Sequence, residues 1–454
     1  MNSFTLYRRR TIAFIMGFIL LLSTMAVDTI ALSPDPDNAA LLYYQALLLK
    51  PEQDTETTRL IRGILRGNEP NDSIREYLKS CNEMFKIVEA ATQIQKCDWG
   101  ALHSQGQELS MVIISQLRQL NLLLRVYART LAADGNYRQA IDWGIKIRQI
   151  GKHIGDDTFT MHGMSLGFER SSLATIQHVL ESITPDSEIL TWLQEQLIIQ
   201  GSPQSPVKLL KNVFELALNA ARRNPTSLNI WRLQIAKFAQ LPYSENWIED
   251  IPEDLIPNED KLKKYWGMLS LTNQEIKEKL SISDQEVKEF RDLLSITDQK
   301  KKEIQELLNL SNEELLERYQ QWYNRWLNSV TLIIESDMIY QKKIEELRRI
   351  EEKRQGPPYD PFTFSSLANP DVIDLYSLHI RDEVYFKTIR AAIGIYLVFA
   401  ETGKLPDKLP RNLPKDPYSG QDFEYEITDD GFILSCQVDE IDLNVHRNEF
   451  KVKK

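Results

Sequence analysis

The sequence predicts a mainly α-helical protein that ends in a small α+β module. Apolar residues recur with the 3.6-residue helical period from residue 37 to about residue 245, and almost nothing there alternates with period two. Near the C-terminus, F-E-Y-E-I and F-I-L-S-C do alternate, around a T-D-D-G turn. We expect a signal peptide or membrane anchor at 1–32, an antiparallel helical domain at 37–250, a charged helical insertion at 251–355 and an α+β module at 362–446.

The N-terminus joins a basic cluster to an apolar run. Arg8, Arg9 and Arg10 precede an uncharged, mostly apolar stretch from Thr11 to Val27. This pattern is typical of a secretory signal or an N-terminal anchor that starts in the cytoplasm. The run is short for a spanning helix and small residues follow it, so cleaved and retained forms both stay open. We expect the rest of the chain outside the cytoplasm, either anchored to the inner membrane in the cell envelope or periplasmic or secreted.

The charge balance and the cysteines exclude several classes of site. A formal net charge of −11, with basic residues spread among acidic ones, gives no footprint for nucleic acid. Because no C-x-x-C or H-x-x-x-H spacing occurs, we expect no metal site, and nothing indicates a cofactor. Residues 74–95 are predicted as one helix, which would hold Cys81 and Cys97 too far apart for a disulfide. We therefore expect buried free thiols.

One turn in the helical domain has a more specific pattern. L-A-A-D-G-N-Y-R-Q-A-I, residues 131–141, resembles the turn between the two helices of a tetratricopeptide repeat. No matching copy lies about 34 residues away, as a repeat array would require. A single helical hairpin is therefore expected there.

The segment M-H-G-M-S-L-G-F-E, residues 161–169, contains the G-x-S-x-G pattern of a nucleophile elbow. An elbow requires a preceding strand, whereas the residues around Ser165 have helical spacing. We therefore predict a structural serine and assign no catalytic residue; a serine hydrolase that uses Ser165 is the minor alternative. Gly163 and Gly167 are expected at a close helix crossing or at a local loosening of the helix.

Four related cassettes mark the insertion. L-S-L-T-N-Q-E-I, L-S-I-S-D-Q-E-V, L-S-I-T-D-Q-K-K and L-N-L-S-N-E-E-L start at residues 269, 280, 294 and 308. Three of them have a hydroxyl residue followed three positions later by Glu, which predicts a capping box and a series of short helices. A long amphipathic helix is expected over 312–354, before the G-P-P-Y-D-P break at 356–361. The insertion is either a docking arm for proteins or a solvated helical segment.

The C-terminal module resembles the C-terminal half of the major pseudopilin of type II secretion. That family has a helix with a tyrosine, a Gly-x-x-Pro segment, a D-P-aromatic-x-G turn and two strands. The matching residues here are Tyr396, Gly403, Pro406, Asp416, Pro417, Tyr418, Gly420, Tyr425, Gly431, Phe432 and Ser435. The chain is similar as well to bacterial exported or membrane-anchored proteins with helical bodies, which share this ending, the N-A-A-L-L-Y-Y-Q-A start at 38 and C-D-W at 97. Those proteins have no assigned activity.

Two departures limit the resemblance to the pseudopilin. Prepilins are cut after a glycine that precedes the apolar run, with Glu fifth in the mature chain, whereas Gly17 lies inside the run and Leu22 is fifth after it. The calcium loop of the family is replaced by Q-V-D-E-I-D-L, so Asp439, Glu440 and Asp442 are not carried over as ligands. We expect the helix and hairpin to form one unit, separable from the helical domain.

Together these features predict a non-enzymatic envelope protein that acts through protein–protein contacts. The N-terminal segment provides its contact with the membrane, and its protein partners are unknown. An accessory component of a type II secretion or pilus-like machine is the first alternative.

Overall fold

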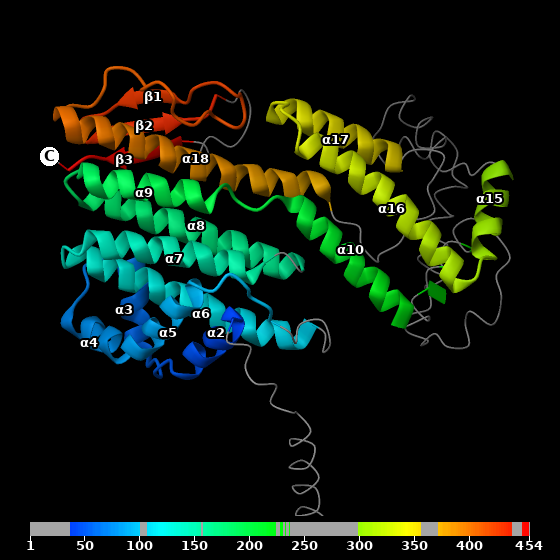
Figure 1. Ribbon diagram of the computed structural model, residues 1–454, viewed down its shortest axis with the longest axis horizontal. Helices are drawn as coiled ribbons and strands as arrows, with labels where there is room; N and C mark the ends of the chain where they lie inside the picture. The colour runs from blue at the N-terminus through cyan, green and yellow to red at the C-terminus, as the bar shows by residue number, and fades with distance from the viewer. Residues whose placement is uncertain are drawn as a thin grey trace, which may run out of the picture.

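The computed structural model describes residues 37–99, 107–155, 158–223, 298–355, 371–437 and 447–453, together with residues 228, 229, 232 and 236. This part of the protein is mainly helical, with one antiparallel sheet of order β1-β2-β3 near the C-terminus (Figure 1). The predicted signal or anchor and the cassettes at 269 and 280 lie outside the described residues. Among the described helices, none has the length and apolar character that a membrane crossing requires.

The helices are α2 (Ala39–Leu48), α3 (Thr55–Leu65), α4 (Asp72–Ser80), α5 (Asn82–Thr92), α6 (Gln107–Ala133), α7 (Tyr137–Ile154), α8 (Phe159–Ser182), α9 (Ser187–Gln200), α10 (Pro206–Arg223), α15 (Asp298–Leu308), α16 (Asn312–Ile334), α17 (Tyr340–Gln355) and α18 (Val372–Thr402). The strands are β1 (Glu424–Ile427), β2 (Gly431–Ser435) and β3 (Arg447–Lys451).

The central helices α7 and α8 lie between two apolar clusters. The N-terminal cluster joins α2–α6 to one face of α7 and α8, including Ile147 and Phe168. The C-terminal cluster joins the other face, including Ile145 and Leu173, to α9, α10, α15–α18 and the sheet. In Figure 1 the blue and cyan helices accordingly lie on one side of this pair, and α9, α18 and the sheet lie on the other. Both central helices are therefore buried on two faces.

The predicted hairpin at 131–141 is formed by α6 and α7. The turn between them contains Gly135, whose positive φ of 81° suits a residue without a Cβ atom. The amide of Asn136 donates to the Leu131 carbonyl at 2.8 Å, which closes the end of α6. The two helices therefore pack against each other as the spacing predicts.

The predicted single helix over 74–95 is wrong. It is divided at Cys81, which ends α4 and precedes α5 and has φ −85° and ψ −1°. Apolar spacing continues across this break because both helices turn their apolar residues, such as Leu78 and Val88, toward the same N-terminal cluster. Periodicity alone therefore does not reveal the break. None of Cys81, Cys97 and Cys436 forms a disulfide; Cys81 and Cys436 are buried, whereas Cys97 is only half-buried, in contrast to the expectation.

The predicted helix over 312–354 is also divided. It forms α16 and α17, which lie side by side in Figure 1. Side chains satisfy the carbonyl groups at the end of α16, since Ser336 Oγ donates to Ile333 and Lys343 Nζ donates to Ile334, each at 2.7 Å. At its start, Ser311 and Glu314 form the predicted capping box. The fourth cassette therefore starts a helix, as predicted.

The C-terminal sheet has one strand more than the predicted hairpin. Strand β2 lies between β1 and the added strand β3, which extends to Lys451, beyond the predicted end of the module at 446. Phe432 of β2 stacks on Phe450 of β3 and lies edge-on to Tyr396 of α18. The tyrosine hydroxyl donates to the Lys451 carbonyl at 2.6 Å, so helix and sheet form one layered unit.

This unit shares its core with the helical domain, in contrast to the expected separable module. Residues of α18 and of the sheet belong to the same C-terminal cluster as α8 and α9. Gln177 of α8 donates to the Glu449 carbonyl of β3 at 2.9 Å and accepts a hydrogen bond from Tyr385 of α18 at 2.8 Å. The apolar core therefore continues from the helical domain into the C-terminal residues.

The glycines at the close helix crossing are not the predicted ones. Gly163 and Gly167 are exposed on α8, and a Cβ atom at either position would meet nothing within 4 Å. On α7, a Cβ atom at Gly144 would lie 2.8 Å from Ile176, and one at Gly151 would lie 3.0 Å from Phe168 and 3.1 Å from the Ser165 carbonyl. Helices α7 and α8 therefore approach closely through the glycines of α7.

This difference predicts opposite effects for two matched substitutions. Gly151→Ala should lower the free energy of unfolding by about 1–3 kcal/mol, because its methyl group overpacks the crossing. Gly167→Ala should raise it by about 0.5–1 kcal/mol, because alanine is the better helix former at an open position. Urea unfolding of both variants checks this. A destabilised Gly167→Ala variant beside an unchanged Gly151→Ala variant would contradict the packing described here.

Candidate functional site

The G-x-S-x-G segment does not form a nucleophile elbow. Ser165 lies inside α8, which begins after Thr158, whose side chain accepts from the Met161 amide. Ser165 is buried, with 7% of its surface exposed. His379, one of the downstream histidines, lies on α18, and His446 is outside the described residues. The geometry around Ser165 is that of a packed helix.

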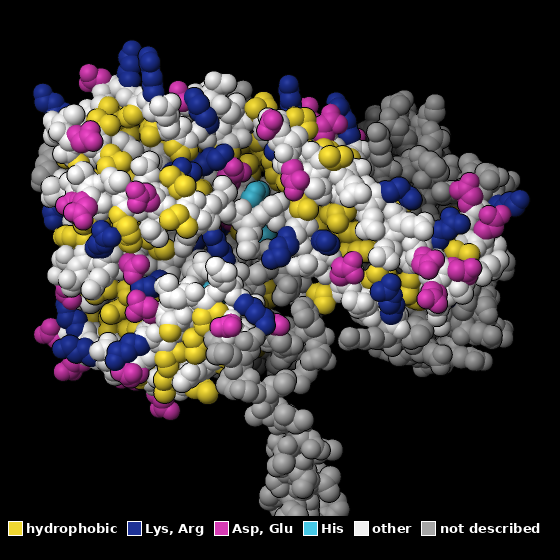
Figure 2. Space-filling model, viewed as in Figure 1, with side chains coloured by type: hydrophobic (Ala, Val, Ile, Leu, Met, Phe, Trp, Pro, Cys, Tyr) yellow, Lys and Arg dark blue, Asp and Glu magenta, His cyan; other side chains and the backbone are white. Residues whose placement is uncertain are grey.

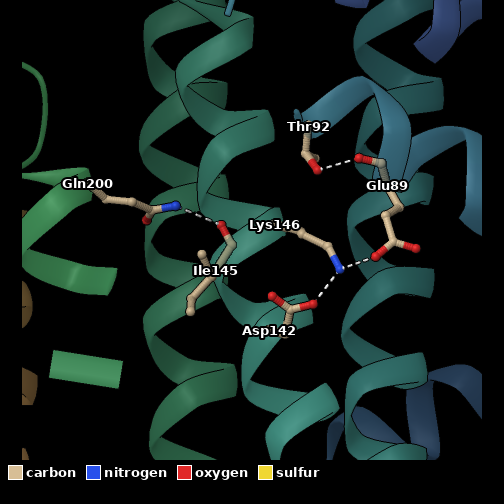
Figure 3. Close-up of polar contacts among 6 residues, drawn as sticks. All are labelled: Glu89, Thr92, Asp142, Ile145, Lys146 and Gln200. Atoms are coloured by element: carbon tan, nitrogen blue, oxygen red, sulfur yellow. Dashed lines mark hydrogen bonds and ion pairs between the residues drawn. The ribbon is translucent and has the colours of Figure 1, made fainter. Parts of the chain in front are cut away.

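A buried lysine holds α5 to α7. The ammonium group of Lys146 on α7 contacts Glu89 of α5 at 2.6 Å and also Asp142, one turn earlier on α7 (Figure 3). Burial alone would lower the pKa of Lys146, but the hydrogen bonds to Asp142 and Glu89 more than offset burial and raise it. The lysine is therefore held protonated, which suits a structural clamp and not a nucleophile or a general base.

A second set of buried charges connects α7, α8, α9 and α18. The fully buried guanidinium of Arg148 contacts Glu169 of α8 at 2.5 Å and donates to the Gly201 carbonyl, at the end of α9, at 2.8 Å. Its Cζ atom lies 4.2 Å from the ring centre of Phe386 on α18. One side chain of α7 therefore contacts three other elements of the fold.

The next residue of α8 makes a related pair. Arg170 is ion-paired with Asp382 of α18, whose side chain is 1% exposed. Burial raises the pKa of Asp382 to about 6, although Arg170 opposes the rise. Perturbed carboxyl groups occur at active sites, but this one is closed to solvent and already has a cationic partner. It is better explained as part of the contact between α8 and α18.

An open pocket lies beside the α6–α7 hairpin. It has a volume of about 400 Å³, and the loop after α3, helices α6 and α8 and the C-terminal residues form its wall. Its acidic and basic side chains are Glu69, Arg129, His178, Glu181 and Lys453. A smaller apolar part of the wall comes from Ile64, Pro70, Ala132, Ala133 and Tyr137. None of these residues was a predicted site residue, because they come from four separate segments.

Two further properties bear on chemistry. Among the described residues, no group of three or more His, Cys, Asp or Glu side chains is arranged to hold a metal ion. On the face drawn in Figure 2, acidic and basic side chains are interspersed.

No protein-family model, curated protein or solved structure matches the chain with significant similarity.

The burial of Asp382 predicts an unusual dependence of stability on pH. Its pKa is raised in the folded state, so its contribution to stability is complete below the unfolded pKa near 3.8 and is lost as the pH rises through about 6. The shift corresponds to roughly 3 kcal/mol. The asparagine of Asp382→Asn cannot ionise. The unfolding free energy of this variant, relative to that of the wild type at the same pH, should therefore increase as the pH rises from 4.5 to 8. Urea titrations across that range measure the difference, and a constant difference would refute this assignment.

Proposed function

We propose that the protein is a non-enzymatic envelope protein that acts through protein–protein contacts. The observation that carries this proposal is the arm formed by α10, α15, α16 and α17. It extends away from the layered helices of the body (Figure 1). The buried charged groups Lys146, Arg148 and Asp382, in contrast, are all engaged in contacts between helices.

The arm has internal packing of its own and is joined to the body through the C-terminal apolar cluster. Phe214 of α10 stacks on Tyr323 of α16 with ring centres 3.7 Å apart, and the tyrosine hydroxyl donates to the Leu210 carbonyl at 2.7 Å. On α16, Leu332 is 75% exposed. A rigid helix that presents an apolar side chain is a suitable surface for a partner protein.

The first described helix supports a position close to a membrane. Helix α2 contains no charged residue, and Leu41, Leu48 and Leu49 at this end of the chain are exposed. It follows the apolar run Thr11–Val27 after a short segment. An uncharged helix with exposed leucines is favourable beside a bilayer, where such side chains can leave water.

The secretion-machine alternative is supported by the D-P-Y-S-G turn. The buried carboxylate of Asp416 accepts hydrogen bonds from the amides of Tyr418 at 3.0 Å, Ser419 at 3.3 Å and Gln437 at 3.1 Å. The residues that carry the resemblance thus form an organised turn beside the sheet. Co-purification with pseudopilins or their membrane platform would favour this alternative over a general contact protein.

Site-specific photocrosslinking tests the arm. With a photoreactive phenylalanine analogue at Leu332, we expect a discrete adduct with one protein of the native envelope; at Lys79, an exposed polar position on α4, we expect none. Leu332→Glu should reduce co-purification of that protein by about tenfold, because a charge replaces an apolar contact. If Leu332 gives no adduct while the protein is exported and folded, the arm is not the contact surface.

Export is tested separately. A reporter that is active only outside the cytoplasm, fused after residue 40, should be active with the native start. It should lose most of this activity when Arg8, Arg9 and Arg10 are replaced by Glu, since positive charge keeps this end in the cytoplasm. Activity that is absent with the native start would contradict the proposed location.

A further inference from the structure

The pocket between α6 and α8 contains opposite charges that are not joined in an ion pair. Arg129 of α6 and Glu181 of α8 both line it and act on each other electrostatically, but no salt bridge within 4.0 Å joins them in the described part of the chain. Arg129 uses Nη1 to donate to the Ile64 carbonyl at 2.7 Å, and its buried Nε has no hydrogen-bond partner. Glu181 accepts one hydrogen bond, from Gln177 at 2.9 Å. Both groups therefore keep capacity to bind something else.

The remaining polar side chains of the pocket also include both cationic and anionic groups. His178 lies one turn before Glu181 on α8, and no described residue hydrogen-bonds its imidazole ring. Lys453 approaches from the C-terminal residues and donates to the Ser182 carbonyl at 3.4 Å. Glu69 lines the pocket from the loop after α3. The pocket therefore has cationic and anionic groups in similar number.

Burial strengthens these groups as ligands. Burial lowers the pKa of Arg129 and of His178, and burial raises the pKa of Glu181. The ionised groups therefore lack part of the hydration that they would have in free solution. A ligand that brings the opposite charge to each would replace that hydration, in a site where charges interact more strongly than in water.

We propose that this pocket binds a small zwitterion with an apolar side chain, such as a free α-amino acid or a short peptide. The carboxylate of the ligand would lie against Arg129, and its ammonium group would lie against Glu181. The apolar wall of Ile64, Ala132 and Tyr137 would receive its side chain. A volume of about 400 Å³ is within the usual range for small-ligand sites. This activity is additional to the contact function of the arm.

Calorimetric titration of the full chain with leucine, N-acetyl-leucine, leucinamide and dileucine tests the proposal. Leucine should bind, and loss of either ligand charge should weaken binding at least about tenfold, as expected for a charge-assisted contact. Tighter binding of dileucine than of leucine would assign the site to short peptides, and the reverse would assign it to free amino acids.

Matched variants locate the site. Arg129→Gln and Glu181→Gln should each weaken leucine binding at least about tenfold. Arg118→Gln, exposed on the same helix as Arg129, and Glu188→Gln, exposed at the start of α9, should leave it unchanged. Because Arg129 also holds the end of α3, Ala133→Trp gives a second test, since it fills the pocket from an exposed position and removes no hydrogen bond.

Three results would overturn the proposal. One is the absence of any heat of binding with leucine and dileucine at ligand concentrations up to about 10 mM. A site that pairs with both ligand charges is expected to saturate below that concentration. Another is equal binding of leucine and N-acetyl-leucine. The third is unchanged binding by a folded Ala133→Trp variant.

Discussion

The buried ion pair of Arg148 and Glu169 is the interaction on which the arrangement of the helices depends. The arginine is fully enclosed, so its charge must be matched by the carboxylate of α8, the carbonyl at the end of α9 and the ring of Phe386 on α18. Removing one partner of such a pair costs about 3–5 kcal/mol, whereas replacing the whole pair with apolar side chains is often neutral. We infer that the pair selects which helix faces meet more than it adds stability.

The selection matters because α7 and α8 are apolar on two faces. Such helices could turn either face to either neighbouring layer unless polar contacts distinguish the layers. Lys146 fixes one side by pairing with Glu89 of α5, and Arg148, two residues later, fixes the other side against α9 and α18. The glycines of α7 then allow close approach to α8, since Gly151 lies against Phe168 and the Ser165 carbonyl. The charged residues therefore set the orientation of helices α7 and α8, and the glycines set the distance between them.

Much of the helical fold could be predicted from the sequence, because apolar period and capping residues act locally. The breaks at Cys81 and after Ile334 could not, since the residues on both sides of each break face one core. Strand β3 was missed for a related reason: within R-N-E-F-K only Phe450 is buried, so the segment has a weak alternating pattern. The two motifs at 38 and 97, in contrast, were noticed in the sequence, but their contact with each other was not predicted. Asn38 exchanges hydrogen bonds with the backbone of Asp98 at 2.9 Å, and Tyr43 stacks on Trp99, so they form one contact between distant segments.

The buried charged residues fall into two groups: some are paired with a neighbouring helix, and others lie beside an open pocket. Lys146 and Asp382 have strongly perturbed surroundings, yet both have an ionic partner on a neighbouring helix, and their charges serve the fold. Arg129 and Glu181 are also perturbed by burial, but their protein contacts leave part of their hydrogen-bonding capacity unused beside an open pocket. A perturbed pKa alone therefore does not separate structure from function in this protein. The separation comes from whether a neighbouring helix or an open pocket faces the charge, a property that depends on segments far apart in the sequence.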